Sequence, residues 1–597
     1  MPTTIEVNKQ SVEALLGSGK SKPFVIPEYQ RPYAWTDEQV ETLFEDLWDF
    51  TATSGGTERE SSYFLGSVVS YENEDGEQEI IDGQQRITSL FLLLRAIYTK
   101  LVATPASERT AEANNFIGKI EPTIWRTNKL TGTVDFKNIL LTSRVVNNEG
   151  NEILRSILET GKADEDAKDN YSKNYRHFQE LFDKHSTENP LMVYQFIYAL
   201  LNQAILLPIT ADTQDTALTI FSTLNDRGLP LSDADIFKAK IYNQLAPDDK
   251  KAFIDRWKDL DEQSTDANES IQQLFYYNMF YYRALDKDTK TTTPGVRKYY
   301  AANKFERLYK PELLDTLFVI LNLWKVVNKG EELEDEAWSK NIKIRQTLDI
   351  LTSYPNEYWK YPVVIYYVCY RNEENFETRF ARFLNKLLME LMTKYLMIPT
   401  INAVKPDILK LNSAIVASDM PTFEFKTIDM TQLEPYIQNP NRNVVRMLLK
   451  TLAYEHQDDL LPAKWEIEHI FPQKWQTNYF PDEPDATIKE KIEHIGNKLP
   501  FEKKLNIVAG NGYFGKKKKE YIASKIVITK AMGTSDVMDW NLESITKRDI
   551  RVSDEVVKIM NRWNNEYLNT PVSEGKAGEP SEEELAQIEK FKKNGWI

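Results

Sequence analysis

The stretch IIDGQQRITSLFLLL (residues 80–94) carries the chain from an apolar strand directly into a helix. Apolar residues recur from Ile87 to Leu101 with the helical period of about 3.6 residues, which predicts a helix there. The residues before it read as two strands, SYFLGSVVSYE and QEIIDG, around the polar turn ENEDGE. We therefore expect a mixed α/β fold for the first 100 residues.

The Asp82-Gly83 junction of this stretch suits an anion. A helix start exposes unpaired backbone N–H groups and the positive end of the helix dipole, both of which attract phosphate. Gly83 permits close backbone approach, and Arg86 would add a bidentate phosphate contact. Asp82 would then hold a metal ion or a water. A plain strand–turn–helix in which Asp82 only caps the helix explains the same residues equally well.

Two other polar motifs belong to the N-terminal half. PEYQRPYAW (27–35) places Arg31 among aromatic residues, which can stack on bases or hold phosphates. A surface loop that docks its aromatics on the domain is the alternative. FSTLNDRGLPLSDADIFKAKIY (221–242) has an Asn-Asp-Arg-Gly turn before a helix that starts with acidic residues matched to the dipole. That turn is a weak signal for a second phosphate or ribose contact.

The composition limits the class of protein. The chain has 597 residues, 41% of them hydrophobic, enough for several domains of roughly 100–200 residues. The net charge of −16 argues against indiscriminate coating of nucleic acid, which needs many Lys and Arg contacts to phosphate. A single cysteine, Cys369, excludes an internal disulfide and a cysteine-based zinc site. No apolar run approaches about 18 residues and no secretory signal opens the sequence, so we expect a cytoplasmic protein without a membrane segment.

Composition and turn signals predict four parts. Residues 1–245 hold the motifs above, and residues 246–440 are aromatic-rich and predominantly helical, which indicates a helical core rather than a cofactor site. Residues 441–570 follow the boundary NPNRN, and residues 571–597 read as an acidic linker with a short amphipathic helix. The expected fold class is multidomain, α/β plus α.

The stretch WEIEHIFPQKW (465–475) carries the sharpest chemical signal. Glu468 and His469 end a strand-like run, and Asn497 and Asn506 follow with the spacing of an HNH (ββα-metal) nuclease. Phosphodiester hydrolysis needs a general base, and neutral imidazole suits that task. It also needs a divalent cation held by hard oxygen ligands, which carboxylate and amide side chains supply, while a further asparagine can fix the imidazole tautomer.

The helix KKKKEYIASK (516–525) would add contacts to the phosphate backbone. The alternative for the whole region is a partly buried histidine beside asparagines that only form turns.

Together these motifs resemble the GmrSD family of modification-dependent (type IV) restriction endonucleases, with relatives such as SspE and BrxU. IPEYQRPYAW, DGQQR and LNDRG resemble the family's N-terminal domain, and IEHIFPQ, GNKLP and the lysine-rich pattern resemble its C-terminal HNH domain. The resemblance implies a ParB/sulfiredoxin-like domain that binds and hydrolyses a nucleoside triphosphate (GTP, UTP or ATP). It also implies an HNH domain that uses Mg²⁺ or Mn²⁺.

The resemblance also implies a role for each matched residue. In the HNH domain His469 would be the general base, Asn497 would orient it, and Glu468 and Asn506 would be metal ligands. Two departures are a Glu where the family often has Asp before the histidine, and a second hairpin arm that is more polar than usual. The nucleotide site would draw on three motifs: Asp82, Gly83, Gln84, Gln85 and Arg86; Tyr29, Gln30 and Arg31; Asn225, Arg227 and Gly228.

The expected function is therefore a nucleotide-regulated, metal-dependent endonuclease that cleaves or nicks modified double-stranded phage DNA. A homodimer is one possible assembly. The principal alternative is a nucleotide-binding anti-phage regulatory or DNA-binding protein with an inactive HNH scaffold. An RNA-directed nuclease is a third hypothesis.

Overall fold

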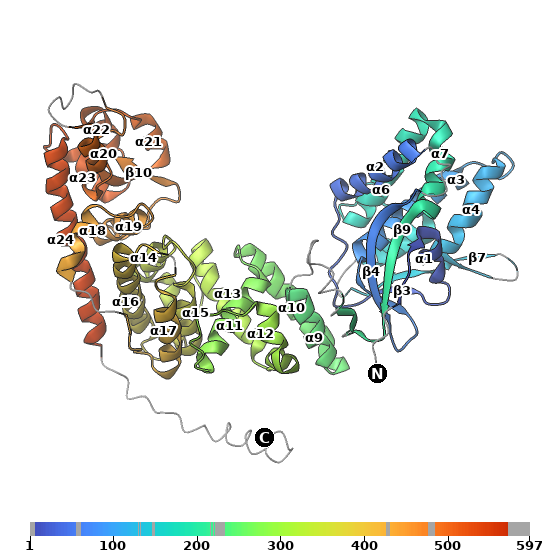
Figure 1. The fold of residues 1–597 in the computed structure, drawn as a ribbon, viewed down its shortest axis with the longest axis horizontal. Helices are drawn as coiled ribbons and strands as arrows, with labels where there is room; N and C mark the ends of the chain where they lie inside the picture. The colour runs from blue at the N-terminus through green and yellow to red at the C-terminus, as the bar shows by residue number, and fades with distance from the viewer. Residues whose placement is uncertain are drawn as a thin grey trace, which may run out of the picture. The chain divides into compact units, whose positions relative to one another are not determined.

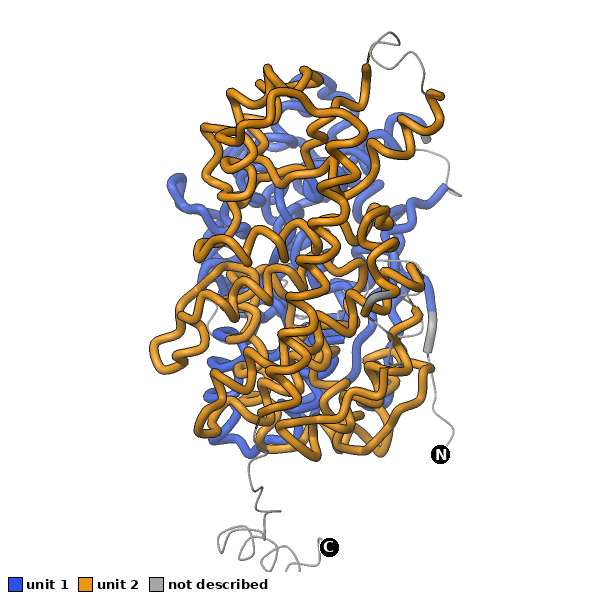
Figure 2. The backbone as a smooth tube through the Cα atoms, turned by 90° about the vertical axis from the view of Figure 1, so that its left-hand side faces the viewer, with its two compact units in different colours: residues 1–259 blue, residues 260–597 orange. Residues whose placement is uncertain are grey.

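The computed structural model describes most of the chain, in two compact units formed by residues 1–259 and 260–597 (Figure 2). The fold is mixed α/β and mostly helical with a small sheet, as the sequence predicts. The third N-terminal motif, with Asn225, Arg227 and Gly228, lies outside the described residues, as does the predicted C-terminal linker and helix. The described residues are 6–54, 61–128, 131, 133–145, 150–214, 216–218, 220, 233–400, 402–425, 430–475 and 484–570.

The described part of unit 1 is built on one seven-stranded mixed sheet in the order β1-β9-β4-β5-β3-β8, with β2 also paired to β9. Strands β4 and β5 are the antiparallel pair predicted around the ENEDGE turn. β5 pairs in parallel with β3, and β4 pairs in parallel with β9. The strands are β1 (Glu6–Val7), β2 (Gln10–Ser11), β3 (Phe24–Ile26), β4 (Tyr63–Glu72), β5 (Gln78–Asp82), β8 (Leu141–Ser143) and β9 (Ala204–Ala211).

Helix α3 (Gln84–Ala103) is the centre of the unit 1 core. Its sequence is apolar on nearly every side, and accordingly almost all of its residues from Gln84 to Tyr98 are buried. The other helices and a small β6–β7 ribbon pack around it or extend the unit (Figure 1). They are α1 (Val12–Ser18), α2 (Asp37–Ser54), α4 (Ala111–Ile124), β6 (Trp125–Thr127), β7 (Val134–Ile139), α5 (Gly150–Thr160), α6 (Asn170–Glu188), α7 (Val193–Tyr198), α9 (Asp233–Gln244) and α10 (Pro247–Asp266).

The first part of unit 2 is a stack of helices whose aromatic residues form its interior. The rings of Tyr366 and Phe383, for example, stack at 4.1 Å between centroids. The aromatic runs are thus helical core, as their spacing predicts. The helices are α11 (Ile271–Leu285), α12 (Val296–Ala301), α13 (Leu313–Lys329), α14 (Ile342–Leu351), α15 (Lys360–Tyr370), α16 (Phe376–Met397), α17 (Lys405–Ala417), α18 (Glu434–Gln438) and α19 (Val445–His456).

The second part of unit 2 carries a two-stranded antiparallel hairpin followed by a helix. Strand β10 (Trp465–His469) pairs with β11 (Lys498–Glu502), so that Glu468 lies opposite Leu499 and His469 opposite Lys498. The chain then enters α21 directly, and the 27-residue helix α24 packs against the turn before β11 and against α16 and α18 (Figure 1). The helices are α20 (Asp485–Ile492), α21 (Lys503–Ala509), α22 (Phe514–Ile522), α23 (Val527–Thr534) and α24 (Leu542–Leu568).

None of the helices described is both long and apolar enough to cross a bilayer.

Candidate functional site

The DGQQR motif forms a tight passage from β5 into α3. Gly83 has φ +87°, in the left-handed region that favours glycine, and a Cβ there would lie 3.2 Å from the Ser67 carbonyl oxygen. Gly83, the N-cap residue of α3, has no side chain to cap it, and no side chain of the described residues is seen to accept from the first N–H groups of the helix. The structure thus has the strand–turn–helix that the sequence predicts at this position, and anion binding there stays a prediction.

Three charged side chains influence one another at this helix start. Arg86 donates from Nη1 to the Ser67 carbonyl oxygen at 2.9 Å, and its guanidinium lies against Gly66, where a Cβ would come within 2.9 Å of Cζ. Burial raises the pKa of Asp82, and the Gly83 N–H together with the charges of Arg86 and the exposed Arg31 opposes that rise. Burial lowers the pKa of Arg86, which Asp82 counteracts.

The structure joins the PEYQRPYAW motif to the DGQQR motif through their glutamines. Gln85 accepts at Oε1 from the backbone N–H groups of Ala34 (2.7 Å) and Trp35 (3.2 Å), and donates from Nε2 to Pro32. Gln30 donates to the Ile81 carbonyl oxygen at 3.2 Å. Both glutamines are buried and satisfy backbone groups, so they build the site rather than present atoms to a ligand.

Tyr29 and Gln84 differ in whether their side-chain oxygen has a hydrogen-bond partner among the described residues. The Tyr29 hydroxyl donates to Glu79 Oε1 at 2.6 Å and accepts from Gln214 Nε2 at 2.6 Å, and burial raises its pKa well above the ordinary value. Tyr29 is therefore locked within unit 1. Gln84 Oε1 is buried and finds no hydrogen-bond partner among the described residues, so it remains a vacant acceptor at the helix start.

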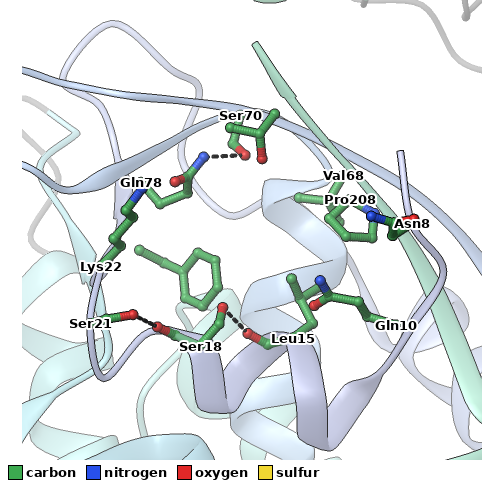
Figure 3. A pocket seen from close by; sticks show the side chains of 12 residues that line it. Asn8, Gln10, Leu15, Ser18, Ser21, Lys22, Val68, Ser70, Gln78 and Pro208 are labelled. Atoms are coloured by element: carbon green, nitrogen blue, oxygen red, sulfur yellow. Dashed lines mark hydrogen bonds between the residues drawn. The ribbon is translucent and has the colours of Figure 1, made fainter. Parts of the chain in front are cut away.

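Unit 1 also has a cavity of about 140 Å³, lined by residues of α1 and of strands β3, β4, β5 and β9. Ser70 and Gln78 line it and hydrogen bond to each other at 2.7 Å (Figure 3), and Phe24 is an apolar lining residue. Gln78 begins β5 and Asp82 ends it, and no residue of the DGQQR or PEYQRPYAW motif lines the cavity. The residues of these two motifs thus lie around the helix start and do not line this cavity.

In unit 2, His469 ends β10 with a ring that is mostly buried. Its Nε2 lies 3.5 Å from Glu493 Oε1 and 3.4 Å from Gln473 Nε2. Burial lowers the pKa of His469, and the nearby charges of Lys498 and Lys517 lower it further while Glu493 raises it. The imidazole is therefore neutral at pH 7, the state that can accept a proton.

Glu493 is a site residue that the sequence reading missed. Burial alone would raise its pKa, but the hydrogen bond and charge of Lys498 (2.9 Å) bring the pKa below its ordinary value, so the carboxylate is ionised beside His469. The signal in the sequence was weak, because Glu493 precedes a loop residue, His494, that draws attention as the more familiar functional type.

Glu468 points away from His469, since neighbouring strand residues alternate between faces. Its buried carboxylate accepts at Oε1 from Lys517 Nζ (2.8 Å) and from the Tyr521 hydroxyl (2.7 Å). Lys517 also donates to the carbonyl oxygen of His469. Of the predicted phosphate-binding lysines, Lys517 is thus turned inward and Lys518 donates to backbone oxygens of the segment after α23, while Lys516 and Lys519 are exposed.

The two predicted asparagines have separate positions. Asn506 on α21 donates to Glu466 Oε2 at 3.2 Å, which puts it over the face of β10 that also carries Glu468. Asn497 is fully buried, where it accepts from the Phe471 N–H (2.7 Å) and donates to the carbonyl oxygens of Phe471 and Ile492. It makes no hydrogen bond to His469 among the described residues, so any effect on the imidazole passes through the loop it closes.

Two residues of helix α24, Asp549 and Arg548, bind the turn that precedes β11, and we call this set of contacts the clamp. Buried Asp549 accepts from the Gly496 N–H (2.7 Å) and from His494 Nδ1 (2.7 Å), and Lys491 pairs with it at 3.0 Å. Arg548 donates to three carbonyl oxygens of the turn, and burial lowers its pKa to about 10, so it stays charged. His494 is accordingly a structural residue of this clamp.

The donor set near Glu468 suits a hard divalent cation. The described residues contain no group of three or more His, Cys, Asp or Glu side chains that could enclose a metal. Glu468 Oε2 and Asn506 Oδ1, however, make no hydrogen bond within the described ranges, although Glu468 Oε1 and Asn506 Nδ2 do. One carboxylate and one amide oxygen fit Mg²⁺, which keeps most of its ligands as water or substrate oxygens.

Family models match both motif regions. Residues 12–242 match the model described as GmrSD restriction endonuclease, N-terminal domain, and residues 427–552 match the model described as GmrSD restriction endonucleases, C-terminal domain. No curated protein matched the chain.

The clamp on the turn predicts that Gly496→Ala destabilises it. A Cβ at Gly496 would lie closer than 3.0 Å to the Ile545 carbonyl oxygen and the Asp549 backbone nitrogen. We expect the free energy of unfolding of this region to fall by about 1–3 kcal/mol. The loss would be seen as faster hydrogen–deuterium exchange of residues 494–502. Gly515→Ala is the matched control, because a Cβ there meets nothing within 4 Å. Equal exchange in the two variants would contradict the clamp.

Proposed function

The chain belongs to the GmrSD family of restriction endonucleases, and from this premise we propose that it is a nucleotide-regulated, metal-dependent endonuclease that cuts modified double-stranded DNA. The observation that supports the cutting activity is His469, a partly buried neutral imidazole that lies 3.5 Å from an ionised carboxylate and follows an anchored glutamate in the chain.

His469 would act as the general base. With the proton on Nε2 facing the ionised Glu493 at 3.5 Å, and the Gln473 amide turned so that its oxygen rather than its nitrogen faces the ring, Nδ1 would keep the lone pair. Nδ1 would then take a proton from the water that attacks the phosphodiester. Glu493 takes the orienting role that the resemblance gave to Asn497, while Asn497 holds the loop that carries Phe471.

Glu468 and Asn506 would hold the cation through Oε2 and Oδ1, the atoms without protein partners among the described residues. A bound Mg²⁺ or Mn²⁺ neutralises charge that develops on the phosphate and the leaving oxygen. The chain's own contribution is to present these two oxygens on the face of β10 opposite the base.

The N-terminal domain would bind and hydrolyse a nucleoside triphosphate at the start of α3. Uncapped N–H groups after Gly83 and the guanidinium of Arg86 suit the phosphates, with Arg31 exposed beside them. Gln84 Oε1, a buried acceptor without a partner in the described chain, would accept from a ligand hydroxyl or amino group. Asp82 would bind a water or the cation that accompanies a triphosphate.

The proposal is tested by incubating the full chain with phage DNA that is unmodified, glucosylated or methylated at cytosine, or phosphorothioated. Each DNA is assayed with Mg²⁺ or Mn²⁺ and with or without GTP, UTP or ATP. We expect cleavage of one modified class and a change in rate with one triphosphate. DNA binding and triphosphate hydrolysis without any cleavage would favour the alternative of an inactive HNH scaffold.

Removal of the imidazole should abolish cutting without loss of binding. We expect His469→Ala to lower the cleavage rate by about 10²–10⁴-fold, the usual contribution of a general base, with unchanged affinity for the DNA in a gel-shift assay. The control is His456→Ala, which removes a half-exposed histidine paired with Glu555 in the same unit. If His469→Ala cuts at the parent rate, the assignment of the base is wrong.

Removal of the Arg86 guanidinium, which we propose binds phosphate, should weaken nucleotide binding. Arg86→Ala is expected to raise the Kd for the active triphosphate by about 10–100-fold, the loss of one or two charge-assisted hydrogen bonds. Arg144→Ala removes an arginine of the same unit that pairs with Glu77 outside the motifs, and should leave the Kd unchanged. Calorimetry measures both, and equal affinities would place the nucleotide elsewhere.

A further inference from the structure

We propose that Lys517 and Tyr521 are positioning residues that anchor Glu468 through one carboxylate oxygen, so that the other is fixed as the metal-binding oxygen. The inference rests on the proposed function, since it concerns the same cation. It gives a role to the lysine-rich helix α22 that differs from contact with phosphate.

The anchor is built from two side chains one helical turn apart. Lys517 and Tyr521 stand at positions i and i+4 of α22 and so lie on one face of it. Both donate to the same atom, Glu468 Oε1, at 2.8 and 2.7 Å. Two donors on Oε1 fix the plane of the carboxylate, and Oε2 is left without a hydrogen bond among the residues described.

Burial makes the anchor necessary. Lys517 and Glu468 are 2% and 4% exposed, and Tyr521 is fully buried. An isolated carboxylate at that depth would be strongly destabilised, and an ion pair with additional hydrogen bonds offsets the desolvation. Lys516 and Lys519 of the same run are exposed, so the inward position belongs to Lys517 specifically.

The same ammonium connects the metal-binding side chain to the base. Lys517 donates to the backbone carbonyl of His469 while it holds the side chain of Glu468. Lys517 Nζ therefore links the last two residues of β10, Glu468 and His469, to helix α22. Hydrogen bonds of this kind to a ligating carboxylate set its orientation, and their removal typically costs about 10–100-fold in metal affinity.

The experiment measures Mn²⁺ binding to the full chain made inert by His469→Ala, by calorimetry and by the electron paramagnetic resonance signal of free Mn²⁺. Tyr521→Phe is the main variant, because it removes one hydroxyl and keeps the ring that packs edge-on against Phe501 at 5.2 Å. We expect it to weaken Mn²⁺ binding by about tenfold. Lys517→Met should weaken it at least as much, while Lys516→Met and Lys519→Met, the exposed neighbours, should have no effect.

Two results are distinguishable. If the inert parent binds Mn²⁺ and Glu468→Ala abolishes that binding, but Tyr521→Phe and Lys517→Met bind as tightly as the parent, the anchoring role is overturned and the metal site stands. If the parent and Glu468→Ala bind Mn²⁺ alike, the proposed metal site itself is wrong. Thermal unfolding of each variant checks folding, and the affinity of Tyr521→Phe alone decides between the outcomes if Lys517→Met fails to fold.

Discussion

The C-terminal site depends on the hydrogen bonds that residues of α24 make to the turn between Ile495 and Lys498. A two-stranded hairpin such as β10–β11 is marginal in water on its own, so it needs support from outside the sheet. Asp549 and Arg548 provide this support. Asp549, whose side chain is buried, accepts from an N–H group of the turn, and Arg548 donates to its carbonyl oxygens. Since these groups are buried, a loosened clamp would leave several of them unpaired at once.

The electrostatics of the site follow from two ion pairs on either side of His469. Glu493 pairs with Lys498 at 2.9 Å, and Glu468 pairs with Lys517 at 2.8 Å. Because each lysine is matched by its own carboxylate, the charges around the imidazole largely cancel, and burial remains the largest influence on its pKa. The imidazole therefore stays neutral among four charged side chains, because burial and the two lysines lower its pKa more than Glu493 raises it.

The helices and strands were predictable from the sequence because apolar periodicity and turn residues lie within the segments that they predict. Helix α3 and the β4–β5 pair follow from apolar period and a polar turn, and the hairpin order follows from the spacing of His469, Asn497 and Asn506. The partners of these residues were not predictable. Asp549 lies on a helix far along the chain from Gly496, and Lys517 sits within a run of four identical residues of which periodicity alone cannot choose the buried one.

Three amide side chains of the motifs bind backbone groups, whereas Gln84 Oε1 has no hydrogen-bond partner among the described residues. Gln85 and Gln30 close the PEYQRPYAW loop onto β5 and α3, and Asn497 closes the loop after β10. An amide suits that task because it offers a donor and an acceptor at once and has no charge to desolvate. Had charged residues held these loops, each would have needed a buried counter-charge, and Arg86 and His469 would have been neutralised by their own scaffold. The most conspicuous residues of a motif therefore include some that hold its loops in place through backbone hydrogen bonds, and only the hydrogen-bond partners in the folded chain identify them.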